Sequence, residues 1–222
     1  MLLNVIITGS TGMVGKGVLL ECIESPDVSS ILLINRSSVD IVHPKVKEII
    51  HKDFFNWTSI RDDLKGYNAC FFCMGVSSAG MKEEDYHRMT YDITLGFAKE
   101  LLPLNPDMTF CYVSGTGTST AMDSRMMWAN VKGKTENDVL GLGFKSAYVF
   151  RPGYIHPFKG IKSKVKVFNV IYSMLSPFYG LLKRMPKYVT DTITIGNAMI
   201  GVSLKGYSKK VLESWDINTF KS

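Results

Sequence analysis

Apolar residues gather along this chain in two alternating kinds of segment. Short runs rich in Val, Ile, Leu and Phe are typical of strands buried in a parallel sheet. Longer segments between them carry apolar residues at spacings of three and four, which predicts amphipathic helices. The predicted strands are residues 2–8, 31–35, 46–50, 69–74, 108–113 and 147–150. The predicted helices are residues 13–23, 57–64, 83–102, 122–140 and 190–204.

The alternation of strand and helix predicts an α/β fold, a doubly wound parallel sheet with helices on both faces. In the helix predicted over 83–102, apolar side chains recur from Tyr86 to Leu101, and Pro103 is expected to close it. Asp191 is expected near the cap of the last helix. Residues 167–182 are apolar and predict a helix in two pieces around Pro177. We expect residues 1–222 to form one domain.

The first predicted strand runs into a glycine turn that reads Thr8-Gly9-Ser10-Thr11-Gly12-Met13-Val14-Gly15. Gly9 permits a tight exit from the strand, Gly12 lets a pyrophosphate approach the backbone, and Gly15 lets the helix pack closely on the sheet. The N–H groups that open the helix then face the phosphates. Because the turn follows an apolar strand and opens a helix, it predicts a dinucleotide-binding Rossmann fold, with residues 9–15 at the cofactor.

The second strand ends in Ile34-Asn35-Arg36-Ser37. A site for NAD normally places Asp or Glu here, to bind the ribose hydroxyls. Arg36 can instead hold a 2′-phosphate by charge-assisted hydrogen bonds. We therefore predict that Asn35 and Arg36 contact the cofactor and that it is NADP, with NAD as the alternative. The competing interpretation of Arg36 is a solvated side chain at a strand end.

A formal charge of +6 and a pI near 9.0 suit an anionic ligand such as a dinucleotide, and equally an acidic surface. No run of five or more basic residues occurs, which disfavours nucleic acid as a partner. The apolar stretch 165–182 is interrupted by polar residues and Pro177, which disfavours a membrane span. For residues 162–184 we expect a helix folded over the cofactor site, with an amphipathic lid that touches a membrane surface as the alternative.

The four cysteines predict free core thiols in a reducing compartment. Cys70 and Cys73 lie three apart on a strand, so their thiols face opposite sides, and no second Cys or His pair completes a zinc site. The four histidines show no metal-ligand spacing either, so no metal is expected. The first strand begins almost at Met1, which leads us to expect no targeting peptide and a cytoplasmic protein.

Together with the glycine turn, three further elements carry a family resemblance: Ser114 after the fifth strand, Lys132 in the next helix, and Arg151-Pro152-Gly153 after the sixth strand. With them the chain resembles the short-chain dehydrogenase/reductases, and more narrowly the atypical NAD(P)-binding group of epimerase-like and Tat-interacting-protein-like oxidoreductases. The resemblance covers nearly the whole chain. It implies an NAD(P)-dependent oxidoreductase or epimerase-like protein acting on a small molecule, as a monomer or homodimer. Residues 1–153 would form the cofactor-binding core and residues 154–222 a small substrate cap.

The resemblance also implies roles for individual residues. Ser114 would orient the substrate carbonyl, and Lys132 would hold the nicotinamide ribose. The residues implied around the cofactor are Asp53 and Phe54 near the adenine, Cys73, Met74 and Gly75 on the ribose side, and Pro152 and Gly153 after the sixth strand.

One position departs from the family pattern. The family's Tyr-x-x-x-Lys is here Trp128-Ala129-Asn130-Val131-Lys132, so the helical arrangement survives but the acid does not. Indole has a single N–H donor and does not exchange a proton near neutral pH, which general acid catalysis requires. Either another group supplies the proton, with Tyr154 as first candidate and Tyr91 as second, or the domain is a non-catalytic dinucleotide-binding regulator or scaffold.

Overall fold

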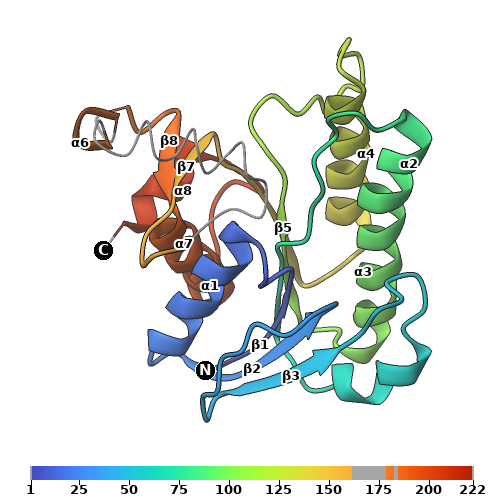
Figure 1. The fold of residues 1–222 in the computed structure, drawn as a ribbon, viewed down its shortest axis with the longest axis vertical. Coiled ribbons are helices and arrows are strands. Elements are labelled where there is room, and N and C mark those ends of the chain that lie inside the picture. Colours follow the sequence, from blue (N-terminus) through green and yellow to red (C-terminus); the bar gives the residue numbers. More distant parts are fainter. Residues whose placement is uncertain (1, 162–178, 183–184, 222) are drawn as a thin grey trace.

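A parallel sheet of seven strands runs through the middle of the molecule (Figure 1). Its strands lie in the order β3-β2-β1-β4-β5-β6-β9, and every neighbouring pair is parallel. The structure is a computed structural model that describes residues 2–161, 179–182 and 185–221. The strands of this sheet are β1 (Leu3–Thr8), β2 (Val28–Asn35), β3 (Val46–Ile50), β4 (Ala69–Phe72), β5 (Thr109–Val113), β6 (Ser146–Arg151) and β9 (Val211–Glu213). A separate two-stranded parallel sheet consists of β7 (Tyr154–His156) and β8 (Val189–Asp191).

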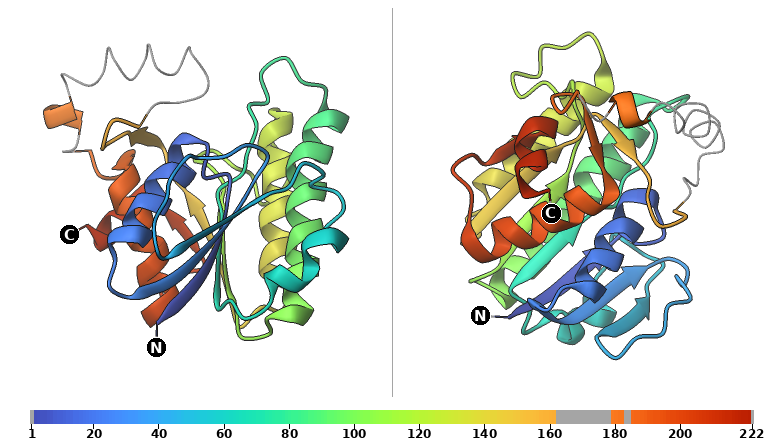
Figure 2. Two further views of the ribbon diagram at one scale, coloured as in Figure 1. Left: turned by 60° about the horizontal axis from the view of Figure 1, so that its bottom comes forward. Right: turned by 90° about the vertical axis from the view of Figure 1, so that its left-hand side faces the viewer.

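Helices cover both faces of the large sheet (Figures 1 and 2). One face carries α1 (Met13–Glu24), α7 (Thr192–Lys205) and α8 (Ser214–Ile217). The other carries η1 (Thr58–Leu64), α2 (Glu83–His87), η2 (Arg88–Asp92), α3 (Ile93–Leu104) and α4 (Met127–Gly141). Two short elements, α6 (Tyr179–Leu182) and η4 (Asn218–Phe220), complete the described chain. This is the predicted doubly wound α/β fold, which the structure confirms.

Each face of the sheet has its own apolar core. Along β1, Val5 and Ile7 pack with α1 and α7, whereas Ile6 packs with Phe97 on the α3 side. All of these side chains are fully buried. The strands are therefore apolar on both faces because helices remove both faces from water, as the continuous apolar runs of the sequence predicted.

Two predicted helices differ from the structure. The helix expected over 83–102 is interrupted by a π-helical turn, η2, and it continues through Pro103 to Leu104 instead of closing at the proline. The helix expected from 122 begins only at Met127. Met122 has a φ of 58°, and the side chain of Asn130 bonds to the backbone N–H and carbonyl of Ser124 at 2.9 and 2.8 Å. These bonds hold residues 122–126 as a loop.

The described part of the carboxy-terminal third holds three strands that the sequence pattern did not reveal. Each of β7, β8 and β9 has three residues, which is too short for a recognisable period, and each pairs with a distant segment. The predicted cap of α7 is confirmed, because Asp191 accepts a hydrogen bond from the N–H of Thr194 at 2.7 Å.

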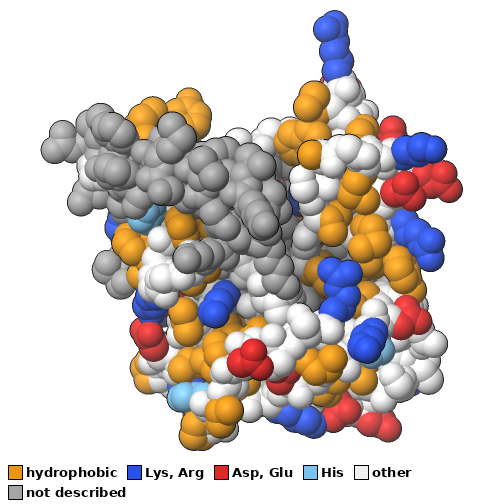
Figure 3. All heavy atoms as spheres, in the orientation of Figure 1, with side chains coloured by type: hydrophobic (Ala, Val, Ile, Leu, Met, Phe, Trp, Pro, Cys, Tyr) orange, Lys and Arg blue, Asp and Glu red, His pale blue; other side chains and the backbone are white. Residues whose placement is uncertain are grey.

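Most of the stretch 162–184, with its predicted two-piece helix and lid, lies outside the described residues; only α6 is described there. None of the helices in the described part of the chain is long and apolar enough to cross a membrane. On the face shown in Figure 3, basic side chains are scattered among acidic and apolar ones instead of forming one patch.

Candidate functional site

The glycine turn is packed too tightly for side chains at its first and third glycines. Gly9 has a φ of 71°, and a Cβ there would lie 2.8 Å from the backbone of Cys73 and Met74. A Cβ on Gly15 would lie 2.3 Å from the carbonyl oxygen of Gly9. Real Cβ atoms do not approach backbone this closely, so both positions require glycine. They bring the turn, the end of β4 and the start of α1 together.

The amino terminus of α1 is open to an anion. Gly12 is its N-cap and, having no side chain, leaves the first N–H groups of the helix without a side-chain acceptor. The first turn also carries no acidic residue. A cleft of about 470 Å³ lies directly at this point. Its lining residues are Gly9, Thr11, Gly12, Ile34, Asn35, Arg36, Phe54, Cys73, Met74 and Gly75.

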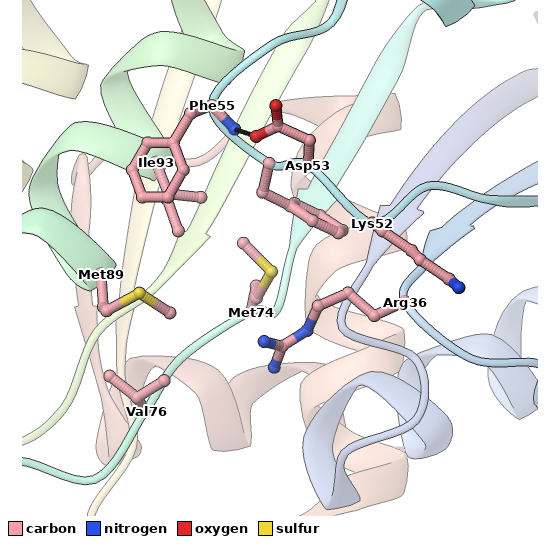
Figure 4. A pocket seen from close by; sticks show the side chains of 9 residues that line it. Arg36, Lys52, Asp53, Phe55, Met74, Val76, Met89 and Ile93 are labelled. Atoms are coloured by element: carbon pink, nitrogen blue, oxygen red, sulfur yellow. Dashed lines mark hydrogen bonds between the residues drawn. The ribbon is translucent and has the colours of Figure 1, made fainter.

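A second cavity of about 420 Å³ continues from the cleft, with Arg36, Phe54 and Met74 common to both (Figure 4). Its walls are mainly apolar, and Figure 4 shows the side chains of Met74, Met89 and Ile93 converging on it. Such walls suit a flat aromatic base. The remaining lining residues are Lys52, Asp53, Phe55 and Val76.

The charged residues of this second cavity behave differently from one another. The guanidinium of Arg36 extends below Met74, whereas Lys52 points away from the cavity (Figure 4). Asp53 uses one carboxylate oxygen to accept the N–H of Phe55 at 3.0 Å, so it stabilises its own turn. Arg36 forms no ion pair with any described residue and therefore retains its donors for a ligand.

Ser10 and Asn35 connect the glycine turn to β2. Both side chains are buried, and the Asn35 amide nitrogen donates to the Ser10 hydroxyl at 2.7 Å. The Ser10 hydroxyl is thus engaged inside the protein, while Asn35 also lines the cleft. Met13 and Val14 lie in the first turn of α1 and line neither of the two cavities.

Ser114 lies where the ends of β5 and β6 meet. Its N–H donates to the carbonyl of Phe150 at 2.8 Å, and the N–H of Thr116 donates to the carbonyl of Pro152 at 3.1 Å. The buried Ser114 hydroxyl is 3.1 Å from that of Thr118, which in turn bonds to the carbonyl of Gly115. The structure therefore places Ser114 beside Phe150 and the loop that follows it beside Pro152, and it adds Thr118, which the sequence did not single out.

Lys132 projects from α4 toward the sheet. Its ammonium lies 5.4 Å from the centre of the Tyr112 ring, and it forms no ion pair within the described chain. Burial lowers the pKa of Lys132 to about 8, and the charge of Glu136 opposes this shift. One turn earlier on α4, Trp128 contacts Gly117 in the loop that follows Ser114. The indole thus packs against the serine loop.

The Arg151 side chain has a structural partner that the sequence did not reveal. Its Nε lies 3.0 and 3.1 Å from the two carboxylate oxygens of Glu136, its Nη2 also contacts Glu136, and its Nη1 lies 3.4 Å from Glu213. Glu136 is fully buried and Arg151 is nearly so. The pair joins α4 to β6, but its two residues are 15 apart in sequence. No local pattern indicates such a contact.

The two tyrosines considered as proton donors lie in different places. Tyr91 donates to Asp138 at 2.5 Å, and the Lys134 ammonium lies 4.5 Å from its ring centre, at the seam between η2 and α4. Tyr154 opens β7, two residues beyond Pro152, and burial raises its pKa. Tyr154 therefore lies two residues from Pro152, whose carbonyl bonds to the loop that follows Ser114.

The described cysteines are all free, and burial raises the pKa of each thiol. Within residues 2–161, 179–182 and 185–221, no group of three or more His, Cys, Asp or Glu side chains is placed to hold a metal ion.

Known proteins resemble the chain over most of its length. No family model matches it. The mitochondrial protein FMP52 of Debaryomyces hansenii is 30% identical over 153 residues, which is 68% of this chain and 66% of that protein. The enzyme WbmF of Bordetella bronchiseptica, solved with NAD⁺, has a TM-score of 0.68 at 14% identity, over 98% of this chain and 76% of its own. A UDP-N-acetylglucosamine 4-epimerase of Methanobrevibacter ruminantium has a TM-score of 0.66 at 15% identity, over 95% and 76%.

The chain has the fold of these structures. The Rossmann-type fold implied by the resemblance to the short-chain dehydrogenase/reductases is thereby confirmed.

The expected cytoplasmic location is wrong. The FMP52 relatives from Debaryomyces hansenii, Emericella nidulans and Saccharomyces cerevisiae are named as mitochondrial proteins. The prediction depended on a strand that starts close to Met1, and the position of a strand does not reveal the compartment of a protein.

Proposed function

We propose that this chain is a short-chain dehydrogenase/reductase that binds NADP. It would transfer a hydride between the nicotinamide ring of NADP and a small carbonyl or hydroxyl compound, as an oxidoreductase or an epimerase-like enzyme. The observation that carries the proposal is the open amino terminus of α1 in a cleft of about 470 Å³. Its N–H groups suit a pyrophosphate, and the adjoining apolar cavity suits an adenine.

Two unpaired cations support NADP over NAD. Arg36 lies at the junction of the cleft and the adenine cavity. Lys16 lines a third cavity of about 500 Å³, whose other lining residues are Ser10, Thr11, Ser37, Ser38 and Val39. Within the described chain neither cation forms an ion pair, and the end of β2 carries no acid to bind ribose hydroxyls. The hydroxyl groups and Lys16 around the third cavity, with Arg36 in the adjoining cleft, favour a phosphate.

Calorimetric titration of NADPH and NADH against the wild type and Arg36→Ala tests the nucleotide preference. We expect NADPH to bind at least tenfold more tightly than NADH, and Arg36→Ala to remove most of that difference. Lys52→Ala is the matched control, because it removes a cation from the same cavity whose side chain points away (Figure 4). Equal binding of both nucleotides, unaffected by Arg36→Ala, would refute NADP preference.

For the chemical step, we propose that Ser114 orients the substrate oxygen and that Lys132 holds the nicotinamide ribose. The half-buried position of Lys132 over the Tyr112 ring and the Ser114–Thr118 hydrogen bond support these roles. Trp128 cannot supply a proton, and the Tyr91 hydroxyl is bonded to Asp138. We therefore propose Tyr154, which opens β7 two residues beyond Pro152, as the proton donor.

Turnover of Tyr154→Phe tests this assignment. Loss of NADPH absorbance would first be followed with a panel of aldehydes, ketones and quinones. With a substrate in hand, Tyr154→Phe should lower kcat at least a hundredfold without changing NADPH affinity, and Tyr91→Phe should change neither. Unchanged kcat in Tyr154→Phe would remove Tyr154 from the mechanism. NADPH binding without turnover of any panel member would favour the regulatory alternative that Trp128 raises.

A further inference from the structure

Glu48 is a carboxylate of β3 that bonds to three neutral donors at the end of β2. Its Oε1 accepts the side-chain amide of Asn35 at 2.8 Å and the backbone N–H of Val39 at 3.1 Å. Its Oε2 accepts the hydroxyl of Ser38 at 2.6 Å. No cation pairs with Glu48 within the described chain. Its hydrogen bonds are therefore directed to the loop that follows β2.

The three residues that donate to Glu48 lie on both sides of Arg36 in the sequence. Asn35 precedes it, and Ser38 and Val39 follow, so that Arg36 and Ser37 form a two-residue span fixed to one carboxylate at both ends. A short span anchored on both sides has few conformations available to it. The direction in which Arg36 leaves the backbone thus depends on Glu48.

The same hydrogen bonds reach the glycine turn. Asn35 donates to Ser10 as well as to Glu48, at 2.7 and 2.8 Å. Ser10 and Lys16, from the glycine turn and α1, line the 500 Å³ cavity together with Ser38, from the loop after β2. Through its hydrogen bonds Glu48 therefore connects the two segments of chain that line this cavity.

A carboxylate at this place has two possible uses toward a dinucleotide. It can accept hydrogen bonds from the ribose hydroxyls of NAD, or it can organise the protein groups that bind a phosphate. A carboxylate has about four acceptor positions. Three of those on Glu48 already receive protein donors, which favours the second use.

We propose that Glu48 is a positioning residue for nucleotide selection: through Asn35, Ser38 and Val39 it holds the Arg36–Ser37 span against the cavity, so that the site accepts a ribose 2′-phosphate. The inference rests on the proposed NADP preference. Glu48 itself does not touch the nucleotide. Its negative charge alone would repel a phosphate, so positioning and simple electrostatics predict opposite effects of removing it.

Two small probes isolate this part of the site: adenosine 2′,5′-bisphosphate and 5′-AMP, which differ only in the 2′-phosphate. Calorimetry would give the Kd of each for the wild type, Glu48→Ala and Glu48→Gln. We expect the wild type to bind the bisphosphate at least tenfold more tightly. Glu48→Ala should lower this preference at least fivefold and change the Kd of 5′-AMP less than twofold. Glu48→Gln should retain most of the preference, because its amide oxygen still accepts from Asn35 and Val39.

Two controls keep the outcome clear. Glu100→Ala removes an equal charge from a residue that lines none of the three cavities, and it should leave the preference unchanged. Ser38→Ala removes one of the three hydrogen bonds and no charge, and it should lower the preference about twofold even if Glu48→Ala fails to fold. A preference that stays constant or rises in Glu48→Ala and Ser38→Ala overturns the role of Glu48. A wild type without any preference overturns NADP selection itself.

Discussion

Helix α4 carries the same lysine–carboxylate spacing twice, and the two pairs behave in opposite ways. Lys132 and Glu136 are four residues apart, as are Lys134 and Asp138. A shift of two residues along a helix turns the side chain by about 200°. One pair therefore faces the sheet, and the other faces the seam with η2.

The outer pair does what its spacing predicts. Lys134 Nζ lies 2.9 Å from Asp138 Oδ2, and both side chains are about two-fifths exposed, at 43% and 40%. The hydrogen bond to Asp138 raises the pKa of Lys134. Hydrogen bonds from Tyr91 and then Lys134 lower the pKa of Asp138.

The inner pair does not form. Glu136 bonds instead to Arg151 on β6, and Lys132 lies over the Tyr112 ring with its pKa lowered to about 8 by burial. The comparison shows that helical spacing decides which residues are neighbours, whereas burial and a third residue from elsewhere decide which of them pair. It also explains how a lysine near a carboxylate has a depressed pKa.

The largest effect is expected from Arg151→Met. The substitution leaves the fully buried Glu136 carboxylate without its main partner, which should lower the free energy of unfolding by about 3–5 kcal/mol. Urea unfolding followed by circular dichroism measures this. The pKa of Lys132 should rise in this variant, because the Glu136 carboxylate no longer binds Arg151 and is free to pair with the Lys132 ammonium.

The double variant Arg151→Met/Glu136→Leu is the control for that prediction. Removing both charges also removes the unpaired carboxylate, so most of the lost stability should return. If the double variant loses as much stability as Arg151→Met and Glu136→Leu lose together, the ion pair is not the reason for the effect.

Lys132→Met is expected to have an intermediate effect on the free energy of unfolding, and the effect should depend on pH. The folded pKa of Lys132, about 8, lies below the unfolded value of about 10.4. The unfolded state thus binds more protons between these values, and wild-type stability rises with pH there. Lys132→Met should be more stable than the wild type at pH 7, with the difference shrinking as pH rises through 8 toward 10. Thermal unfolding from pH 7 to 10 tests this.

Lys134→Met is the matched variant on the outer face. Its lysine has a raised pKa, so the difference from the wild type should not shrink over the same pH range. If the stability of Lys132→Met and that of Lys134→Met change with pH in the same way relative to the wild type, burial does not lower the pKa of Lys132.

The smallest effect is expected from Lys134→Ala. The exposed pair with Asp138 is worth only about 0.3–0.5 kcal/mol, and salt screens it. The loss should fall within that range in dilute buffer and disappear at 1 M salt. A loss above about 1 kcal/mol would remove the contrast between the two faces of α4.

The order of strands and helices could be predicted because each buried strand carries its own apolar run and each long helix its own period. The glycine turn could be predicted for a similar reason, since Gly9 and Gly15 act within one strand–turn–helix unit. The three-residue strands β7, β8 and β9 could not, because their pairing depends on segments far away in sequence. Thr118, Glu48 and the Arg151–Glu136 pair were missed for the same reason.

The sequence by itself determined a Rossmann-type fold with a glycine turn, a basic residue where NAD sites carry an acid, and a tryptophan where the family that the chain resembles has a tyrosine. Only the tertiary structure decided what surrounds these residues: that Arg36 forms no ion pair with the described part of the chain, that Glu48 bonds to the loop beside it, and that Arg151 takes the carboxylate that Lys132 would otherwise bind. The physical reason is the separation in sequence over which each kind of interaction acts. Glycine conformation and apolar periodicity act between near neighbours, whereas burial and ion pairing depend on residues that only the completed fold brings together.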